Sequence, residues 1–293
     1  MNATVTLRRS LLYVPGDKEP MLAKAPGRGA DGLILNLEDA VAPANKQLAR
    51  QAVADALRTL DFGRAEAIVR INPPDTDAGY RDLLAVTPLA PAAILLPKAN
   101  LVEEVRFVAW TIERLEELHN LPAGRIRIMC MIESAAGVLN AVEIAACHVR
   151  VAALIFGATD FSVEVGCTIT EDGRSLLAAA SRIILAARAV GIDTIDTPYM
   201  KLDDPEGLAR SSRSARELGF DGKSAVHPAQ VGPINAAFSP TAEQVAWARR
   251  VVALAPDGDI ARLGAAVLDG QLIEAPHLKR AERILVVAAK LEM

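Results

Sequence analysis

Short apolar segments recur along the chain and alternate with longer amphipathic ones. Most of the short segments are apolar at every position, which is typical of parallel strands covered on both faces. Eight strands are predicted, at residues 10–14, 32–37, 67–71, 93–96, 125–132, 152–156, 192–196 and 222–226.

The segments between these strands carry helix signals. One apolar stripe is spaced as on a helix face: Leu101, Val105, Val108, Ile112 and Leu115. Asp204 followed by Pro205 predicts the start of another helix, as an N-cap and a first-turn proline. Strands alternating with helices favour a closed (β/α)8 TIM-type barrel, and a doubly wound open sheet is the alternative.

Beyond residue 235 the pattern changes. Thr241 and Gln244 form a capping-box pattern, and Asp269-Gly270 joins the apolar runs 265–268 and 271–274 into a predicted hairpin. A last helix is expected from Pro276 to about Leu291. The segment is too apolar for a linker. We therefore expect a catalytic barrel over residues 1–235 and a C-terminal helix–hairpin–helix lid over 236–293 that packs on another surface.

Composition narrows the classes of function. The chain has 293 residues, is 51% hydrophobic and has a formal net charge of -4, which gives no reason to expect nucleic acid as a partner. Three scattered cysteines predict a reducing compartment and no zinc site. With no signal-peptide pattern and no apolar run of membrane-spanning length, we expect a cytoplasmic protein with no membrane partner.

A glycine-rich stretch at residues 27–32 matches the dinucleotide-binding pattern G-x-G-x-x-G. That pattern binds a pyrophosphate only when a strand precedes it and a helix follows it. Here a helical segment, 21–25, precedes it and a strand follows it, so a loop entering the second strand is expected instead.

Charged side chains follow the C-terminal ends of most predicted strands. In a barrel these ends share one mouth, where catalytic groups lie. The candidates are Glu38, Asp39, Arg70, Lys98, Glu133, Asp160, Asp196 and Lys223.

Glu133 and Asp160 follow consecutive strands, so their carboxylates can be neighbours. Mg²⁺ typically binds one or two carboxylates and shares oxygens with substrate and water. These two residues therefore form a candidate magnesium site. The alternative is a salt bridge to Arg70 or Lys98.

Arg70 offers a planar fork for a substrate carboxylate, unless it serves as the ion-pair partner of Glu38 or Asp39. Glu38 and Asp39 are expected to support the site residues, with a helix cap as the alternative. Lys98 is also expected beside the site, and a structural role is the competing interpretation. The same structural role is expected of Asp196, Lys223 and a loop histidine, His227. No local Ser-His-Asp or Cys-His signature is present.

Eight ordered motifs together resemble the citrate lyase β-subunit family, with its citryl-, malyl- and citramalyl-CoA lyases, within the HpcH/HpaI aldolase group. The resemblance covers nearly the whole chain. The motifs are RSLLYVPG at 9–16, LNLEDAV at 35–41, VRIN at 69–72, LPK at 96–98, MIES at 131–134, GATDF at 157–161, GKSAVHPAQ at 222–230 and EAPHLK at 274–279.

The resemblance implies a (β/α)8 barrel, Mg²⁺ held by Glu133 and Asp160, and substrate contact by Arg70 and Glu133. It also implies a homotrimer or hexamer in which the C-terminal lid covers a neighbour's site, bringing Glu274 to the substrate. Two positions depart from the family pattern, which usually has Asp at both: Asn36 and Glu274.

The implied reaction is Mg²⁺-dependent cleavage of a carbon–carbon bond in a β-hydroxyacyl-CoA thioester, giving an acyl-CoA and a 2-oxo acid. Arg70 would position the carboxylate and Glu274 would protonate the enolate carbon. Because an enolate is the shared intermediate, an acyl-CoA thioesterase on the same scaffold is one alternative. A weakly active subunit working in a complex with an acyl carrier protein is the other.

Overall fold

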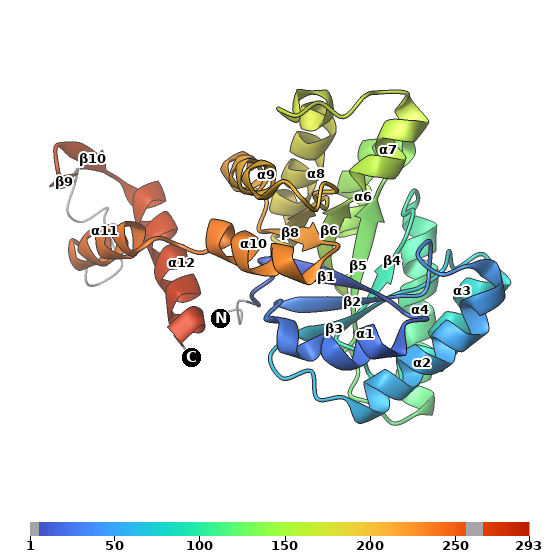
Figure 1. Ribbon diagram of the computed structural model, residues 1–293. Helices are drawn as coiled ribbons and strands as arrows, with labels where there is room; N and C mark the ends of the chain where they lie inside the picture. Colours follow the sequence, from blue (N-terminus) through green and yellow to red (C-terminus); the bar gives the residue numbers. More distant parts are fainter. Residues whose placement is uncertain (1–5, 256–265, 293) are drawn as a thin grey trace. The chain divides into compact units, whose positions relative to one another are not determined.

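A computed structural model describes residues 6–255 and 266–292 of the chain. The chain divides into two compact units (Figure 1). The first, here called the barrel unit, is Arg8–Ala237. The second, here called the C-terminal unit, contains the described residues from Phe238 onward.

The barrel unit is built on eight parallel strands that close into a barrel in chain order, with β1 paired to both β2 and β8. This confirms the predicted (β/α)8 fold and excludes the open sheet. The expected strands agree with the observed ones to within two residues. They are β1 (Ser10–Pro15), β2 (Gly32–Asn36), β3 (Glu66–Arg70), β4 (Ala93–Leu96), β5 (Arg127–Ile132), β6 (Val151–Phe156), β7 (Asp193–Asp196) and β8 (Gly222–Ala225).

Helices follow the strands and lie around them (Figure 1). Their bounds are α1 (Glu19–Lys24), α2 (Lys46–Thr59), α3 (Asp77–Val86), α4 (Val102–Leu118), α5 (Ala135–Leu139), α6 (Ala141–Ala146), α7 (Ala158–Val165), α8 (Leu177–Val190), α9 (Pro205–Leu218) and α10 (Val231–Phe238). The predicted cap of α9 is confirmed, because the Gly207 N–H donates to the Asp204 carboxylate at 2.7 Å. The glycine-rich stretch 27–32 follows α1, passes through a 3-10 turn (Pro26–Arg28) and leads into β2 at Gly32, so it enters the second strand as expected.

Every second strand residue faces the barrel interior. Ile68 on β3 and Met131 on β5 belong to the interior apolar cluster, with Tyr13 packed against it. Arg70 and Glu133 each lie two residues further along, so their side chains face the same interior at the C-terminal mouth. The parity of the strands thus directs both charged side chains to one place.

The opposite, N-terminal end of the barrel is closed by ion pairs from Arg8. Its guanidinium bonds Glu66 at the start of β3, at 2.7 and 2.9 Å, and Asp193 at the start of β7, at 2.7 Å. Arg8 is only 8% exposed, and it joins the first, third and seventh strands there.

The C-terminal unit contains α11 (Ala242–Ala253), the antiparallel strands β9 (Ala266–Leu268) and β10 (Gln271–Ile273), and α12 (Ala275–Glu292). The Thr241 and Gln244 capping box forms as predicted. The hairpin also forms, although residue 265, included in the predicted first run, lies outside the described residues. The unit has its own apolar core, to which Ala248, Ile273 and Leu278 contribute. Its packing on a neighbouring subunit stays a prediction.

Within residues 6–255 and 266–292, no helix is both long enough and apolar enough to cross a membrane.

Candidate active site

The mouth of the barrel brings together most of the predicted site residues. Arg70 ends β3, Lys98 follows β4, and Glu133 follows β5. Glu38 lies two residues beyond β2, and Asp160 lies in the first turn of α7. These five side chains form one connected group, here called the mouth cluster.

Arg70 lies at the centre of the mouth cluster. Its Nη2 is 2.7 Å from Glu38 Oε2, 3.5 Å from Asp39 Oδ2 and 3.7 Å from Glu133 Oε1. Burial alone would lower the pKa of the guanidinium, but the surrounding acidic groups raise it. Although Arg70 is ion-paired, its Nε and Nη2 have no hydrogen-bond partner of good geometry, and the residue is only 6% exposed. The ion pair with Glu38 agrees with one interpretation made from the sequence, and the binding of a substrate carboxylate by Arg70 stays a prediction.

Glu38 is fixed by its own short loop. Its N–H donates to Asn36 Oδ1 at 3.0 Å, and its carboxylate accepts the Asp39 N–H at 2.7 Å. The Lys46 ammonium donates to the carbonyls of Leu37 and Glu38, at 2.8 and 2.9 Å. Burial raises the pKa of Glu38, and Arg70 opposes that rise. The predicted supporting role suits Glu38, which holds Arg70 in place; Asp39, half exposed, is a weaker neighbour.

Lys98 contributes through its backbone as well as its side chain. Its φ of 49° is in the left-handed region, an uncommon conformation for a residue with a side chain. In this conformation its N–H donates to Glu133 Oε1 at 2.8 Å, while its ammonium lies 3.3 Å from Glu38 Oε1. Burial would lower the pKa of the ammonium, but the nearby carboxylates raise it. Lys98 therefore links Glu133 to Glu38.

Glu133 is 3% exposed and lies beside Asp160, whose carboxylate is close enough to share a hydrogen bond with it. Burial and the adjacent acid raise the pKa of Glu133 to about 8, although Arg70 acts to lower it. Gly157 makes room for this carboxylate: a Cβ there would lie 2.5 Å from Glu133 Cβ and 2.6 Å from Oε2. Two carboxylates are thus held close together, where burial and mutual repulsion make it unfavourable for both to ionise. A bound cation would remove this unfavourable free energy.

The donor set suits a hard divalent cation. No group of three or more His, Cys, Asp or Glu side chains able to hold a metal occurs within the described ranges. Glu133 and Asp160 alone would leave most positions of an octahedral ion to water and substrate, which is how Mg²⁺ is commonly held. Asp160 is exposed at the mouth, so the second carboxylate is accessible from solvent.

Tyr13 was not singled out from the sequence, yet it lies in the mouth. Its ring packs on the interior cluster, and the Arg70 guanidinium carbon is 6.0 Å from the ring centroid. In the sequence it reads as one more core residue in an apolar run. Only its position two residues after the interior-facing Leu11 could have indicated that it faces the mouth.

Three residues near the strand ends do not join the mouth cluster. Asp196 and Lys223 bond each other at 2.5 Å, and since Ile195 faces the interior, Asp196 faces outward. The expectation that both would converge at the mouth was wrong, because strand parity directs them outward. His227 caps a short helical turn, its Nδ1 accepting the Ala229 N–H at 3.2 Å.

Glu274 belongs to the C-terminal unit, where it directly precedes α12. Its N–H donates to His277 Nδ1 at 3.1 Å, and its side chain is exposed. Its approach to a mouth cluster stays a prediction.

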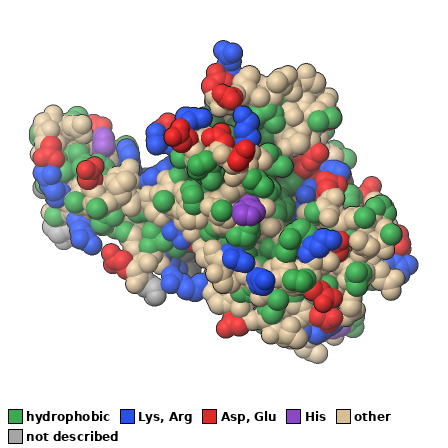
Figure 2. Space-filling model, in the orientation of Figure 1, with side chains coloured by type: hydrophobic (Ala, Val, Ile, Leu, Met, Phe, Trp, Pro, Cys, Tyr) green, Lys and Arg blue, Asp and Glu red, His purple; other side chains and the backbone are tan. Residues whose placement is uncertain are grey.

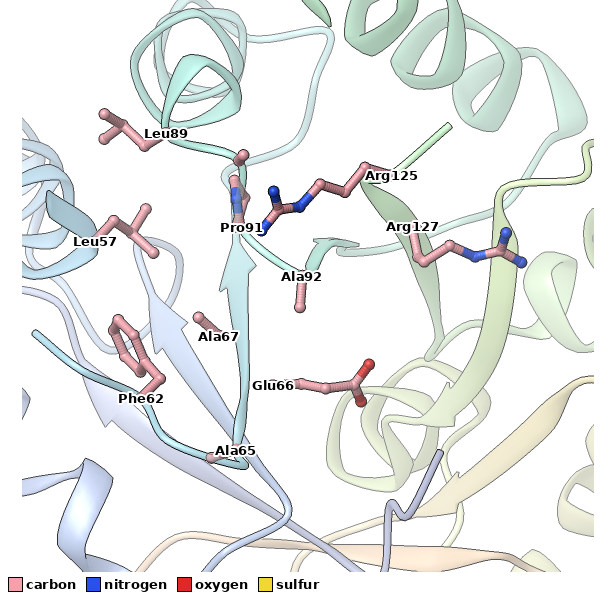
Figure 3. Close-up of a pocket in the computed structure, with 11 residues that line it drawn as sticks. Leu57, Phe62, Ala65, Glu66, Ala67, Leu89, Pro91, Ala92, Arg125 and Arg127 are labelled. Atoms are coloured by element: carbon pink, nitrogen blue, oxygen red, sulfur yellow. The ribbon is translucent and has the colours of Figure 1, made fainter. Parts of the chain in front are cut away.

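A cavity of about 480 Å³ lies at the other end of the barrel (Figure 3). It is lined by residues that enter β3, β4 and β5, among them Phe62, Glu66, Pro91, Arg125 and Arg127. Its position at the N-terminal end separates it from the mouth cluster.

On the face seen in Figure 2, acidic and basic side chains are interspersed, with apolar side chains between them.

The chain matches the HpcH/HpaI aldolase/citrate lyase family over residues 9–228. It is 36% identical to the citrate lyase subunit beta of Leuconostoc mesenteroides subsp. cremoris, covering 96% of this chain and 93% of the relative. It is 38% identical to the (3S)-malyl-CoA thioesterase of Cereibacter sphaeroides, covering 96% and 94%.

Among solved structures, the protein CitE from Mycobacterium tuberculosis, in complex with magnesium, acetoacetate and coenzyme A, is similar with a TM-score of 0.78 and 33% identity. The match covers 97% of this chain and 98% of that one. The closed barrel, the residues gathered at its mouth and the extent of these matches all point to one family. The chain belongs to the HpcH/HpaI aldolase/citrate lyase family.

Proposed function

We propose that this protein is a Mg²⁺-dependent lyase that cleaves a β-hydroxyacyl-CoA thioester, of the citryl-, malyl- or citramalyl-CoA type, to an acyl-CoA and a 2-oxo acid. The relative from Mycobacterium tuberculosis was solved with magnesium, acetoacetate and coenzyme A, and magnesium and a CoA group are components of the proposed reaction. Three features of the chain itself support the proposal: a buried arginine, a carboxylate pair and the mouth they share.

The observation that carries the proposal is the state of Arg70. A buried guanidinium with unused N–H groups, held beside the carboxylate pair, is suited to bind a substrate carboxylate through two parallel hydrogen bonds. Glu38 fixes its position from one side. Binding there would place the carbon next to the carboxylate near Glu133 and Asp160.

Glu133 and Asp160 are the proposed magnesium ligands. When bound, the ion supplies Lewis-acid stabilisation of negative charge on the oxygens of the 2-oxo acid. Lys98 would keep one oxygen of Glu133 occupied through its N–H, so that the other faces Gly157 and the mouth. The pair would then present ionised oxygens in a fixed orientation.

In the proposed reaction the substrate hydroxyl becomes the oxo group of the 2-oxo acid, and the proton that it releases balances the one that the enolate carbon takes up. The adjacent carbon–carbon bond breaks, and its electron pair becomes the enolate of the acyl-CoA. Glu274 would donate a proton to the enolate carbon, arriving from a neighbouring subunit of a homotrimer or hexamer. Closure by that subunit's C-terminal unit would exclude water from the reactive carbon.

The two departures from the family pattern leave this chemistry possible. Asn36 accepts the Glu38 N–H through its amide oxygen, a bond that an aspartate oxygen would also make. The loop of Glu38 therefore does not need a charge at position 36. Glu274 keeps the carboxylate and extends it by one methylene.

Two alternatives are supported by the relatives. A thioesterase is favoured by the 38% identity to a malyl-CoA thioesterase, since the same scaffold could hydrolyse the thioester bond and leave the hydroxy acid intact. A subunit acting with an acyl carrier protein is favoured by the similarity to a citrate lyase subunit beta.

The experiment that tests the proposal incubates the purified chain with Mg²⁺ and citryl-, malyl- and citramalyl-CoA, and separates the products by chromatography. An acyl-CoA and a 2-oxo acid in equal amounts are expected for the lyase. Free CoA with an intact hydroxy acid would indicate the thioesterase. Mg²⁺ binding without turnover of any thioester would contradict the free-standing lyase and favour the subunit. A chelator control and Arg70→Lys should both abolish genuine activity.

A further inference from the structure

Tyr13 is an aromatic residue in direct contact with the mouth cluster. It lies on β1, two residues after Leu11, and its ring rests on the interior apolar cluster. The guanidinium carbon of Arg70 lies 6.0 Å from the ring centroid, within the range of a cation–π contact. The ring thus packs against the Arg70 guanidinium, which also forms an ion pair with Glu38.

The phenol group is placed among charges. Arg70, Glu133, Glu38 and Asp160 all lie close enough to influence its ionisation. Burial raises the pKa of Tyr13 well above its ordinary value, so the hydroxyl keeps its proton and can donate a hydrogen bond. Among residues 6–255 and 266–292, no hydrogen-bond partner of this hydroxyl is found.

A hydroxyl at this position needs a reason, because phenylalanine would fill the same space on the apolar cluster and support Arg70 equally well. Tyr13 is only partly buried, and its hydroxyl is not among the enclosed polar atoms that lack a partner, so this hydroxyl is open to a ligand at the mouth. Arg70, directly above the ring, has the complementary property: N–H donors without hydrogen-bond partners. Unused donors on two adjacent side chains require the same kind of ligand, an acceptor with several lone pairs.

A carboxylate meets this requirement. It has about four lone-pair sites, so the two donors of an arginine fork leave sites for a further donor. The acidic residues of the mouth would repel a second anion, but Arg70 and Lys98 balance part of that charge.

We propose that the Tyr13 hydroxyl is a substrate-binding donor, which hydrogen-bonds the same carboxylate of the 2-oxo acid that Arg70 binds. This inference rests on the proposed function and adds a second recognition group to it. It makes Tyr13 a determinant of specificity for substrates whose carboxylate adjoins the hydroxyl-bearing carbon.

The test compares Tyr13→Phe, which keeps the ring, with Tyr13→Leu, which removes it. Binding of pyruvate and of its uncharged amide, pyruvamide, is measured by calorimetry on the full chain with Mg²⁺. A hydrogen bond to a charged group predicts pyruvate binding about 10- to 100-fold weaker in Tyr13→Phe. Pyruvamide binding should weaken by a smaller factor, because charge-assisted hydrogen bonds are about twice as strong as neutral ones. Tyr80→Phe, at an exposed tyrosine on α3, is the matched control and should bind like the parent protein.

The outcomes separate this inference from the proposed function. If the parent protein binds neither pyruvate nor the 2-oxo acids that citryl-CoA and malyl-CoA would give, the proposed function fails first. If the parent binds pyruvate and Arg70→Lys loses it, while Tyr13→Phe binds normally, the hydroxyl has no part in recognition and the inference is overturned. Equal loss for pyruvate and pyruvamide would also overturn it, because a contact with the carboxylate should distinguish the two.

A second measurement does not depend on folding of a variant. The parent protein is labelled with 3-fluorotyrosine, and the three tyrosine signals are assigned with Tyr80→Phe and Tyr199→Phe. Saturation with pyruvate should shift the ¹⁹F signal of Tyr13 and leave the other two in place. An unmoved Tyr13 signal at saturation would count against the contact.

Discussion

Replacing Gly157 by alanine tests whether the position of Glu133 decides activity. The backbone of Gly157, with φ -95° and ψ 71°, is outside the left-handed region, so alanine brings no intrinsic backbone strain there. The added Cβ would instead lie 2.5 Å from Glu133 Cβ and 2.6 Å from Oε2. Ordinary contact begins near 3.4 Å, so the two residues must separate by about 0.9 Å.

Most of that separation has to come from Glu133. Glu133 Cβ is attached to the backbone next to β5, and Gly157 follows β6, the strand paired with it. A closed barrel resists widening between paired strands, so the carboxylate is displaced from Lys98 and Asp160. Displacements of about 1 Å at a reacting centre can reduce rates about 100-fold. Overpacking should lower the free energy of unfolding by about 1–3 kcal/mol.

The assay measures kcat/KM for the preferred thioester, Mg²⁺ affinity by calorimetry, and urea unfolding. We expect kcat/KM to fall about 100-fold and Mg²⁺ to bind more weakly, in a protein that stays folded. Gly27→Ala is the matched control, because a Cβ there meets nothing within 4 Å and its φ is ordinary. A folded Gly157→Ala protein with parental activity and Mg²⁺ affinity would refute the argument that Glu133 is held in one position.

Three further predictions concern the charged residues. Arg70→Lys keeps the charge but loses the planar fork, so kcat/KM should fall severely; parental kinetics would remove Arg70 from the site. Glu133→Ala and Asp160→Ala should each lose Mg²⁺ affinity in calorimetry while circular dichroism shows a folded protein; parental affinity in both would show that the metal assignment is wrong. Glu274→Ala should bind substrate but cleave it about 10²–10⁴-fold more slowly, the usual contribution of a placed acid. Co-refolding Glu274→Ala with Arg70→Ala subunits should restore part of the activity if sites are shared, and verified hybrids as inactive as their parents would exclude sharing.

The barrel could be predicted from the sequence because the patterns that define its strands and helices are local. Uninterrupted apolar runs between helical segments define strands buried on both faces, and their number and alternation leave few topologies. The same reasoning located Arg70 and Glu133, since each lies at the C-terminal end of a predicted strand.

The sequence was less informative where a side chain's direction depends on neighbouring strands. Asp196 ends β7 as Arg70 ends β3, yet it faces outward and bonds Lys223, the second residue of β8. Tyr13 was overlooked because an aromatic residue in an apolar run is indistinguishable from core. Nothing in the sequence indicated that the Lys98 backbone N–H would bond Glu133, because the left-handed conformation of Lys98 results from tertiary context.

The ion pairs of Arg8 also bear on how the chain reaches its folded state. Arg8 and Asp193 are 185 residues apart in the sequence, yet they meet at the closed end of the barrel. Contacts of such high sequence separation form late, because the entropy of closing a long loop must be overcome before they contribute. During synthesis the first strand emerges long before the seventh, so its sheet edge stays unpaired for most of translation. Barrel closure is therefore the step at which this protein is most exposed to misassembly, and the proline that ends β1 limits the edge that is open to wrong partners.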